Sequence, residues 1–334
     1  MSGTDTRLAQ LRAWLTQTAV KQAFTLAPAS VDASFRRYFR VTVDDISYIA
    51  MDAPPPQEDC RPFVKIAALM YEAGLNVPQV IAQDIQRGFL LLTDLGTTTY
   101  LNGFDANNPD KLFSDAIDAL ITWQCASCPG VLPPYNSALL QREMALFPDW
   151  YVGKHLQTTF TAAQHQVFAA TSKLLIDAAR AQPSVYVHRD YMPRNLMLST
   201  PNPGVLDFQD AVYGPITYDV ASLFRDAFVS WPEQRELDWV IRYWERAKAA
   251  GLPVNADFAL FWREVEWMGL QRHIKVLGIF ARINYRDGKP HYLKDTPRFI
   301  IYARKVSSRY RELGPFAKLL DELEGRAHSI GYTF

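Results

Sequence analysis

The sequence is poor in cysteine and lacks any long hydrophobic run. Only three of its 334 residues are cysteine, an odd number that argues against a disulfide framework. No uncharged apolar stretch approaches the roughly 20 residues that span a bilayer. The N-terminal segment places Leu8, Leu11, Trp14 and Leu15 at helical spacing and contains no readable signal peptide. We therefore expect a cytoplasmic protein in a reducing compartment, with no membrane partner.

The sequence also carries no formal net charge. The chain has 35 basic and 35 acidic residues, for a formal net charge of +0, so nothing indicates a nucleic-acid partner or an anionic membrane surface. The charge is nevertheless uneven, since residues 235–311 hold sixteen Lys or Arg against eight Asp or Glu. Cys125 and Cys128 form a CxxC pair, but no second Cys or His pair completes a zinc site, and we interpret them as two thiols near a helix end.

What the sequence does contain is enough apolar material for a large core in about two lobes, with 49% hydrophobic residues. Residues 39–43 and 46–51 are rich in β-branched and aromatic residues, and Asp44-Asp45 supplies a hairpin turn. An amphipathic helix is expected over residues 63–71, stopped at Gly74, and a second strand pair over 80–85 and 89–92. The first part is therefore predicted to be a small, mostly β lobe with one helix.

After Asp94-Leu95-Gly96 the pattern changes to long helical periods. The predicted helices cover residues 111–125, 137–147, 161–181, 219–229, 235–250, 258–285 and 297–310. We predict an α+β protein with a β-rich N-lobe (residues 1–95) that binds nucleotide, and a larger helical C-lobe (residues 96–334) that carries the catalytic loop and binds substrate.

The chemistry is concentrated in one short region. The segment His188-Arg189-Asp190-Tyr191-Met192-Pro193-Arg194-Asn195 precedes an apolar hairpin that leads to Asp207-Phe208. Phosphoryl transfer needs a carboxylate that orients the attacking hydroxyl, together with an amide oxygen and a second carboxylate that hold magnesium on the phosphates. We predict that Asp190 is the catalytic carboxylate and that Asn195 and Asp207 bind Mg²⁺.

Each of these residues has a structural interpretation when taken singly, because Asp and Asn are common in turns and caps. The joint pattern, H-R-D with Asn five residues after the Asp, an apolar hairpin and Asp-Phe, favours the kinase interpretation. His188 and Arg189 are expected to shape the loop. Asp219 is expected to cap a helix or brace the loop.

On these residues the chain resembles the aminoglycoside phosphotransferase and choline kinase-like family over most of its length, and it matches that family's motif at Asp190, Asn195 and Asp207. The resemblance implies a bilobal protein kinase-like fold, ATP as phosphoryl donor and Mg²⁺ as cofactor. About a dozen residues separate Asp207 from Asp219, which leaves no room for the activation segment of a protein kinase. A small-molecule kinase is therefore favoured.

Four further segments, residues 52–59, 92–96, 147–151 and 271–278, resemble the bacterial cell-wall sugar kinases. Those enzymes phosphorylate the anomeric hydroxyl of N-acetylmuramate and N-acetylglucosamine during peptidoglycan recycling. The resemblance implies that this chain makes a sugar 1-phosphate from such an amino sugar.

The nucleotide side departs from the wider kinase pattern. The expected phosphate-covering loop, residues 30–38, contains no glycine, so close approach to the phosphates depends on small residues such as Ser34. The strand over residues 46–51 lacks the phosphate-binding lysine, which makes Arg37 or Arg40 the nearest candidate cation. Asp94 and Leu95, at the hinge between the lobes, complete the predicted nucleotide-binding residues.

Charge and position in the sequence suggest the class of substrate and the residues that bind it. Because the late helices are net basic, a neutral or carboxylate-bearing sugar fits better than a polycation. The predicted substrate-binding residues are Glu143, Trp150, Arg225, Gln271 and Arg272, and Arg272 can form a fork with a lactyl carboxylate. Two alternatives stay open: a kinase of another small alcohol or of an aminoglycoside, and an inactive nucleotide-binding scaffold, which the missing lysine suggests.

Overall fold

A computed structural model describes residues 5–18, 20, 22–30 and 35–325 of the chain. The chain divides into two compact units, each discontinuous in sequence. Unit 1 comprises residues 1–123 and 193–211, and unit 2 comprises residues 124–192 and 212–334. The two units are described separately below. The functional division into lobes at residue 95 stays a prediction.

Unit 1 contains a five-stranded antiparallel sheet in the order β1-β2-β3-β5-β4. Its strands are β1 (Thr25–Ser30), β2 (Arg37–Val43), β3 (Ile46–Asp52), β4 (Val80–Asp84) and β5 (Phe89–Thr93). Both predicted strand pairs are confirmed. Strand β1 was not predicted, because Pro28 interrupts its pattern. The structure tolerates this proline because β1 lies at the sheet edge.

Two turns fix the registers of the predicted hairpins. Asp44 adopts φ +50 in the β2–β3 turn, a left-handed conformation that Asp tolerates better than most residues. Gly88, before β5, has φ +74, and a Cβ atom there would lie 1.9 Å from the carbonyl oxygen of Ala53. Only glycine fits this close approach.

Helix α1 (Thr6–Thr18) packs on this sheet, as the apolar spacing near the N-terminus predicts. Its buried Leu11, Trp14 and Leu15 join sheet residues in one core cluster. The predicted second helix is α2 (Arg61–Glu72), which has Pro62 in its first turn, buries one apolar face and is followed by Gly74 at φ +95. Both helices therefore follow from local sequence signals.

The rest of unit 1 surrounds a small hairpin. Its elements are α3 (Tyr100–Gly103), α4 (Pro109–Cys125), whose last two residues are assigned to unit 2, η2 (Pro193–Asn195), β7 (Leu196–Met197) and β8 (Gly204–Val205). The predicted apolar hairpin is confirmed as the antiparallel pair β7–β8. The Leu206 amide then donates to the Asn195 carbonyl at 2.9 Å. This bond brings the chain after β8 back to Asn195, immediately before Asp207.

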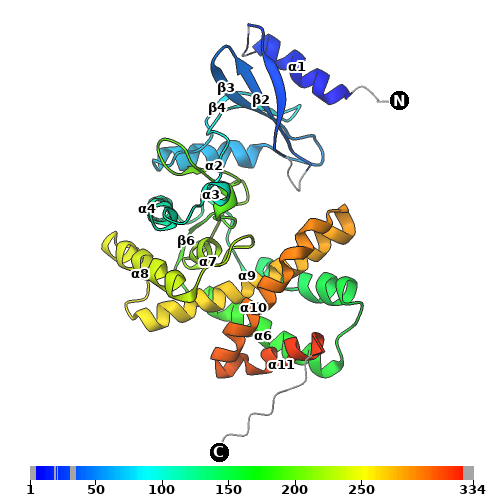
Figure 1. Ribbon diagram of the computed structural model, residues 1–334, viewed down its shortest axis with the longest axis vertical. Helices are drawn as coiled ribbons and strands as arrows, with labels where there is room; N and C mark the ends of the chain where they lie inside the picture. The colour runs from blue at the N-terminus through cyan, green and yellow to red at the C-terminus, as the bar shows by residue number, and fades with distance from the viewer. Residues whose placement is uncertain (1–4, 19, 21, 31–34, 326–334) are drawn as a thin grey trace, which may run out of the picture. The chain divides into compact units, whose positions relative to one another are not determined.

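Unit 2 is mostly helical and is built around one long helix, α9 (Phe258–Asp287), which packs against α6, α7, α10 and η1. Figure 1 shows α9 among these helices. The other helices of the unit are α5 (Ser137–Met144), η1 (Phe147–His155), α6 (Ala162–Ala181), α7 (Tyr218–Phe224), α8 (Glu233–Ala249), η3 (Pro290–Asp295), α10 (Thr296–Arg309), η4 (Arg311–Leu313) and α11 (Gly314–Leu323). Eighteen residues of α9 are buried, so this helix is the centre of the core.

Two predicted helices end earlier than expected. The helix expected over 137–147 stops at Met144 and is followed by the π-helix η1, which has Pro148 in its first turn. The helix expected over 219–229 stops at Phe224, where Arg225 leaves helical geometry and the Asp226 side chain accepts from the Phe228 amide at 3.1 Å. A short strand pair, β6 (Ser184–Val187) with β9 (Val212–Pro215), was not predicted. Four-residue strands give too weak a periodic signal.

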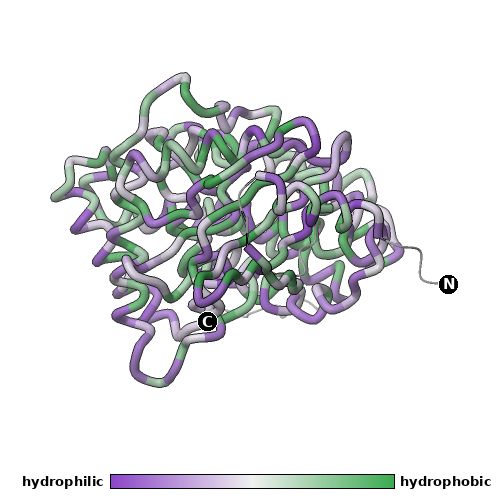
Figure 2. Tube along the Cα trace, turned by 90° about the horizontal axis from the view of Figure 1, so that it is seen from above, coloured by the Kyte–Doolittle hydropathy of each residue, from purple (hydrophilic) through white to green (hydrophobic). Residues whose placement is uncertain are grey.

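Hydrophobic and hydrophilic residues alternate over short stretches of the trace (Figure 2). Among the described residues, no helix is both long enough and apolar enough to cross a membrane.

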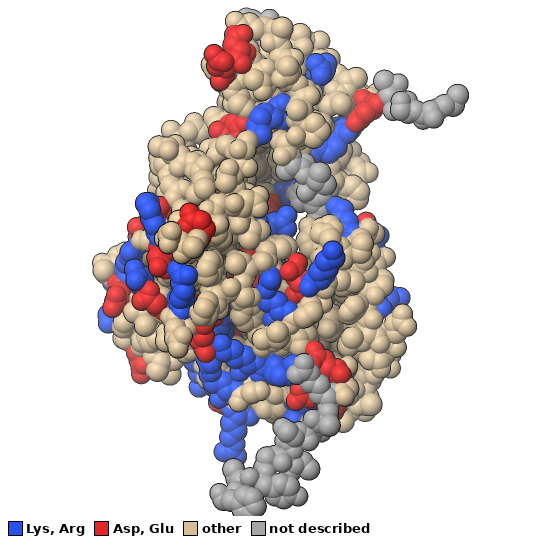
Figure 3. Space-filling model, in the orientation of Figure 1, with Lys and Arg blue, Asp and Glu red and all other residues tan. Residues whose placement is uncertain are grey.

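The basic excess of residues 235–311 is largely paired with carboxylates. Of the cations in this range, Arg263, Arg298, Arg304, Lys305 and Arg309 all form ion pairs with Asp or Glu. Basic and acidic side chains lie next to one another on the face shown in Figure 3. The sequence count therefore overstates how basic the late helices are toward a ligand.

Candidate active site

The predicted catalytic loop begins where strand β6 ends, and one buried carboxylate holds it. Asp219, at the start of α7, accepts hydrogen bonds from the backbone amides of His188 (2.6 Å) and Arg189 (3.0 Å). Arg189 has φ +77, a strained conformation for a large side chain. The expectation that Asp219 braces this loop is confirmed.

The shifted pKa of Asp219 makes the stability of the fold depend on pH. Burial raises the pKa of Asp219 to about 7, although the amides of His188 and Arg189 act in the opposite direction. A carboxyl whose pKa is higher in the folded than in the unfolded state binds its proton more tightly when folded. Its stabilising effect is thus fully present below about pH 4 and is lost as the pH rises through about 7.

We therefore expect Asp219→Asn to reduce this pH dependence. As the pH falls from about 7 to about 4, the free energy of unfolding of the wild type should rise relative to that of the variant. Urea unfolding of both proteins at several pH values measures the difference, with Asp177→Asn, an exposed carboxylate of α6, as the control. A difference that stays constant with pH would contradict the assignment.

Asp190, in unit 2, presents an exposed carboxylate. Its side chain is 42% exposed, whereas that of its neighbour Arg272 is 3% exposed. Arg272 Nη2 lies 3.9 Å from Asp190 Oδ1, and the Asp190 amide donates to His188 Nδ1 at 3.3 Å. The loop therefore presents a carboxylate that is accessible to a ligand and lies beside a buried cation.

Asn195 and Asp207 lie together in unit 1. Asn195 Nδ2 and Asp207 Oδ2 are 3.5 Å apart, and Gln209 Nε2 donates to Asp207 Oδ1 at 2.9 Å. Asp207 has φ +62, a conformation that Asp tolerates better than most residues. Rotating the Asn195 side-chain amide by half a turn would place its oxygen, instead of its nitrogen, next to the Asp207 carboxylate. The pair then offers two oxygen ligands of the kind that Mg²⁺ prefers.

Among the described residues, no three or more His, Cys, Asp or Glu side chains cluster in a way that would hold a metal ion. A site of one amide and one carboxylate fits a Mg²⁺ ion that takes its other ligands from nucleotide phosphates and water. The residues present therefore fit the predicted cofactor only when it arrives with a nucleotide.

The predicted nucleotide-binding residues form two groups of contacts. Ser34 lies outside the described residues. Arg37 pairs with Asp5 and with the buried Asp52. Arg40 and Asp94 lie together, with Arg40 Nε donating to Asp94 Oδ2 at 2.6 Å.

Asp94 directly follows β5, and several hydrogen bonds hold its carboxylate. Burial alone would raise the pKa of Asp94, but hydrogen bonds from Arg40, Ser47 and the Gly96 amide hold it below its usual value. Leu95, the next residue, packs against Gly204: a Cβ atom on Gly204 would lie 2.9 Å from Leu95 Cδ1. Asp94 and Leu95 therefore contact both the sheet and the hairpin that precedes Asp207.

Two predicted substrate residues are held in buried ion pairs. Glu143 pairs with Arg189 and with Lys275 Nζ at 3.0 Å, and it accepts a hydrogen bond from Tyr135. Burial raises the pKa of Glu143, but the two cations outweigh burial and lower it. Arg225 is 3% exposed and lies 3.0 Å from Glu266. We therefore assign Glu143 to supporting the catalytic loop and Arg225 to the core, and the sugar contacts predicted for them stay predictions.

Gln271 and Arg272, on α9, differ from Glu143 and Arg225 because polar atoms of their buried side chains lack hydrogen-bond partners among the described residues. Both are buried, at 0% and 2% exposure. Within the described part of the chain, neither polar atom of the Gln271 side chain has a hydrogen-bond partner, and neither do Arg272 Nε and Nη1. Buried polar groups without partners are costly and often indicate a ligand or water that completes them. Trp150 is half-buried on η1, which packs against α9.

Sequence reasoning missed three residues beside the predicted ones. Asp226 is fully buried; burial raises its pKa to about 6, and Arg272 is the largest influence in the opposite direction. Gln209 orients Asp207, and Arg36 Nη2 lies 3.8 Å from Asp207 Oδ1. The only available signal was proximity in sequence to Arg225, Asp207 and Arg37.

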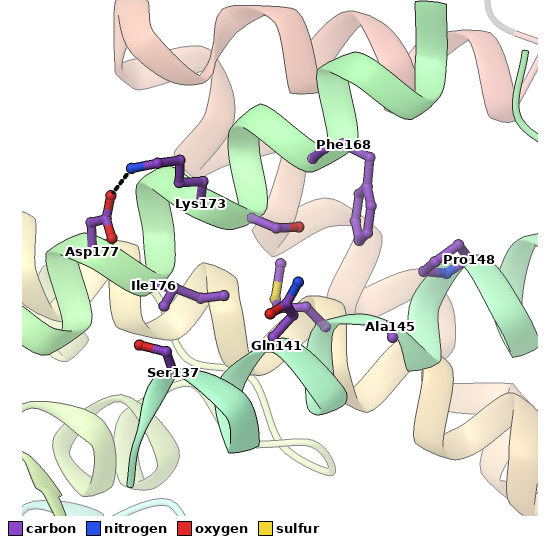
Figure 4. Close-up of a pocket in the computed structure, with 11 residues that line it drawn as sticks. Ser137, Gln141, Ala145, Pro148, Phe168, Lys173, Ile176 and Asp177 are labelled. Atoms are coloured by element: carbon purple, nitrogen blue, oxygen red, sulfur yellow. Dashed lines mark hydrogen bonds and ion pairs between the residues drawn. The ribbon is translucent and has the colours of Figure 1, made fainter. Parts of the chain in front are cut away.

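A separate hollow of about 400 Å³ lies in unit 2 between α5, the start of η1 and α6 (Figure 4). Its lining combines apolar Phe168 and Ile176 with the Lys173–Asp177 ion pair. None of the predicted site residues lines it, so it is distinct from the candidate site.

The sequence profile described as the phosphotransferase enzyme family matches residues 25–254. The chain is also similar to two proteins named N-acetylmuramate/N-acetylglucosamine kinase. The protein from Pseudomonas putida strain KT2440 is 55% identical over 97% of this chain and 99% of its own length. The protein from Pseudomonas aeruginosa strain PAO1 is 52% identical over 96% and 97%.

Among solved structures, a choline/ethanolamine kinase family protein from Mesorhizobium loti superimposes with a TM-score of 0.64. The match covers 95% of this chain and 99% of that one at 13% sequence identity. The likeness therefore concerns the fold, and the predicted α+β, kinase-like architecture is confirmed.

Proposed function

Because the chain belongs to the phosphotransferase enzyme family, we propose that it transfers the γ-phosphoryl group of ATP to the anomeric hydroxyl of N-acetylmuramate and N-acetylglucosamine. Identity above 50% over nearly the whole length to two proteins named for these sugars supports the substrate. One geometric observation carries the proposal. The exposed carboxylate of Asp190 lies beside the buried guanidinium of Arg272, two of whose nitrogens have no hydrogen-bond partner among the described residues.

In this reaction Asp190 accepts a hydrogen bond from the sugar hydroxyl, aims its oxygen at the γ-phosphorus and takes its proton as the P–O bond forms. Arg272 stabilises the negative charge of Asp190 and fixes the side of the carboxylate that faces the sugar. The bond to ADP breaks as the new bond forms. Among the residues that the structure describes, no Cys or His is paired for nucleophilic work, so a direct transfer without a covalent enzyme intermediate fits the site.

Asn195 and Asp207 would hold Mg²⁺, which supplies charge neutralisation to the phosphate oxygens when bound. Gln209 keeps the Asp207 carboxylate oriented through its 2.9 Å hydrogen bond. Asp219 and Glu143 support the loop that carries Asp190, the first through backbone amides and the second through Arg189.

The sugar contacts are proposed for Gln271 and Arg272, with Trp150 as an apolar surface for the ring and Asp226 as a buried acceptor near Arg272. The Gln271 amide, which has no hydrogen-bond partner in the part of the chain that the structure describes, suits the N-acetyl and hydroxyl groups that the two sugars share. The Arg272 guanidinium suits a carboxylate, and only N-acetylmuramate carries one, on its lactyl group.

We expect Arg272→Ala to raise KM for N-acetylmuramate about 10- to 100-fold more than KM for N-acetylglucosamine, since a hydrogen bond to a charged group contributes about 1.5–3 kcal/mol. Steady-state kinetics with both sugars measure the ratio. Arg263→Ala, which removes a partly exposed arginine of the same helix, should leave it unchanged. An equal rise in KM for the two sugars would contradict the proposed contact between Arg272 and the lactyl carboxylate.

The proposal has two competitors: a kinase of choline or an aminoglycoside, and an inactive nucleotide-binding scaffold. ADP release with magnesium, measured over N-acetylmuramate, N-acetylglucosamine, choline and kanamycin, separates them. Turnover with the amino sugars supports the proposal. Turnover only with choline or kanamycin would show that the proposed substrate is wrong. Nucleotide binding without any turnover would favour the inactive scaffold.

We also propose a cellular setting. A reaction that consumes ATP and sugars released from the cell wall belongs in the cytoplasm, within peptidoglycan recycling. The resemblance to the bacterial cell-wall sugar kinases supports this setting.

A further inference from the structure

The strand that carries the phosphate-binding lysine in other kinases ends here in an acid. Asp52, the last residue of β3, is fully buried. Its Oδ1 accepts from Arg7 Nε at 2.9 Å, and its Oδ2 accepts from Arg37 Nη2 at 2.6 Å. The end of this strand therefore holds cations in place within the protein and offers none to a phosphate.

Both arginines suggested by the sequence are used within unit 1. Arg37 stands opposite Asp52 in the β2–β3 register and pairs with Asp5 as well. Arg40 is bound to Asp94 and donates to the Gly96 carbonyl at 2.9 Å. Releasing Arg37 would take away a partner that the buried Asp52 holds in addition to Arg7, and releasing Arg40 would take away the ion-pair partner of the half-buried Asp94. Both losses are costly.

Arg36, one residue before β2, has different surroundings. Its side chain is 12% exposed and lies between two carboxylates, with Nη2 3.8 Å from Asp207 Oδ1 and Nε 3.8 Å from Glu58 Oε2. These distances are those of ion pairs rather than hydrogen bonds. The other oxygen of Glu58 accepts from the Phe35 amide at 3.2 Å, which fixes the backbone next to Arg36.

We propose that Arg36 is the cation that binds the nucleotide phosphates, and that Glu58 holds it as the helix αC glutamate holds the lysine of other kinases. This inference rests on the proposed function, because it assigns Asp207 to the magnesium that accompanies the nucleotide. Because Arg36 Nη2 lies 3.8 Å from Asp207 Oδ1, a phosphate that accompanied magnesium to Asp207 would be within reach of Arg36, and a guanidinium can bind two phosphate oxygens at once. The phosphate-binding role thus moves from strand β3 to the residue that immediately precedes strand β2.

The test measures nucleotide binding directly, so it does not depend on the sugar. We expect Arg36→Gln and Arg36→Ala to weaken MgATP binding about 10- to 100-fold in calorimetric titrations and to leave the affinity for adenosine unchanged. Arg36→Lys keeps the charge and should keep part of the affinity. Arg61→Ala, which removes an exposed arginine at the start of α2, is the matched control and should bind MgATP like the wild type.

Thermal unfolding shows that each variant is folded before titration. The inference is wrong if folded Arg36→Gln binds MgATP as tightly as the wild type, or if it loses adenosine affinity to the same extent as MgATP affinity. Sugar phosphorylation by the wild type is tested separately. If the wild type leaves every sugar unphosphorylated while Arg36→Gln still loses MgATP affinity, the sugar-kinase function fails and the role of Arg36 stands.

Discussion

Asp190→Asn is expected to lower kcat for sugar phosphorylation by about 10²- to 10⁴-fold, which is the usual range for removing a general base. The amide still fits the space beside Arg272 but cannot take the hydroxyl proton. Because Asp190 acts on the acceptor, the KM for ATP should change little. Initial rates at saturating sugar and varied MgATP separate the two parameters.

The matched control for this variant is Asp177→Asn, which removes an exposed carboxylate of the same unit that pairs with Lys173. It should retain wild-type kcat. A rate for Asp190→Asn within a few fold of the wild type would show that another group orients the hydroxyl. A KM for ATP that rises as steeply as kcat falls would point instead to a nucleotide contact.

The second large effect is expected for Asp207→Asn. Metal charge stabilisation in phosphoryl transfer is worth several kcal/mol, so a fall in kcat of about 10³-fold or more should follow at ordinary magnesium concentrations. Gln209 and Arg36, which lie next to the Asp207 carboxylate, would also lose their charged partner. A magnesium titration of the initial rate measures the change.

For a metal ligand, the half-saturating magnesium concentration should rise together with the loss of rate. Asp84→Asn removes a carboxylate that pairs with Arg87 in the same unit, and it should leave both values unchanged. An Asp207→Asn variant with a normal magnesium dependence and a reduced rate would mean that Asp207 acts without contacting the metal.

Most of unit 1 could be predicted because its signals are local. The β2–β3 and β4–β5 hairpins combine β-branched and aromatic strands with Asp, Arg and Gly at the turns. The catalytic-loop hairpin is equally local and follows its motif within a few residues. Strand β1 could not be predicted because Pro28 interrupts its pattern, although its partner β2 follows it closely in sequence. The β6–β9 pair could not be predicted because each short strand is stabilised by a partner distant in sequence.

The limits at the site have another cause: sequence gives the residue type but not its burial or partner. Arg36 and Arg37 are neighbours with the same side chain, yet one faces Asp207 and the other Asp52. The sequence also contained no sign that Glu143 and Arg225 lie in buried ion pairs, and the sugar contacts predicted for them stay predictions. Such contacts join distant parts of the chain.

The charge argument shows the same limit. The count of basic residues late in the chain was correct, but many of those cations are neutralised by nearby carboxylates. What distinguishes Arg272 is therefore its position on α9, buried beside Asp190. Two of its nitrogens have no hydrogen-bond partner within residues 5–18, 20, 22–30 and 35–325.

The most direct test of the proposed reaction is phosphorus NMR of the product formed from N-acetylmuramate, ATP and magnesium. A phosphate on the anomeric oxygen couples to the single anomeric proton, whereas a phosphate on the primary hydroxyl couples to a methylene pair. We expect the anomeric coupling, with a matching product from N-acetylglucosamine. A methylene-coupled product, or ATP hydrolysed to free phosphate with both sugars unchanged, would contradict the proposed function.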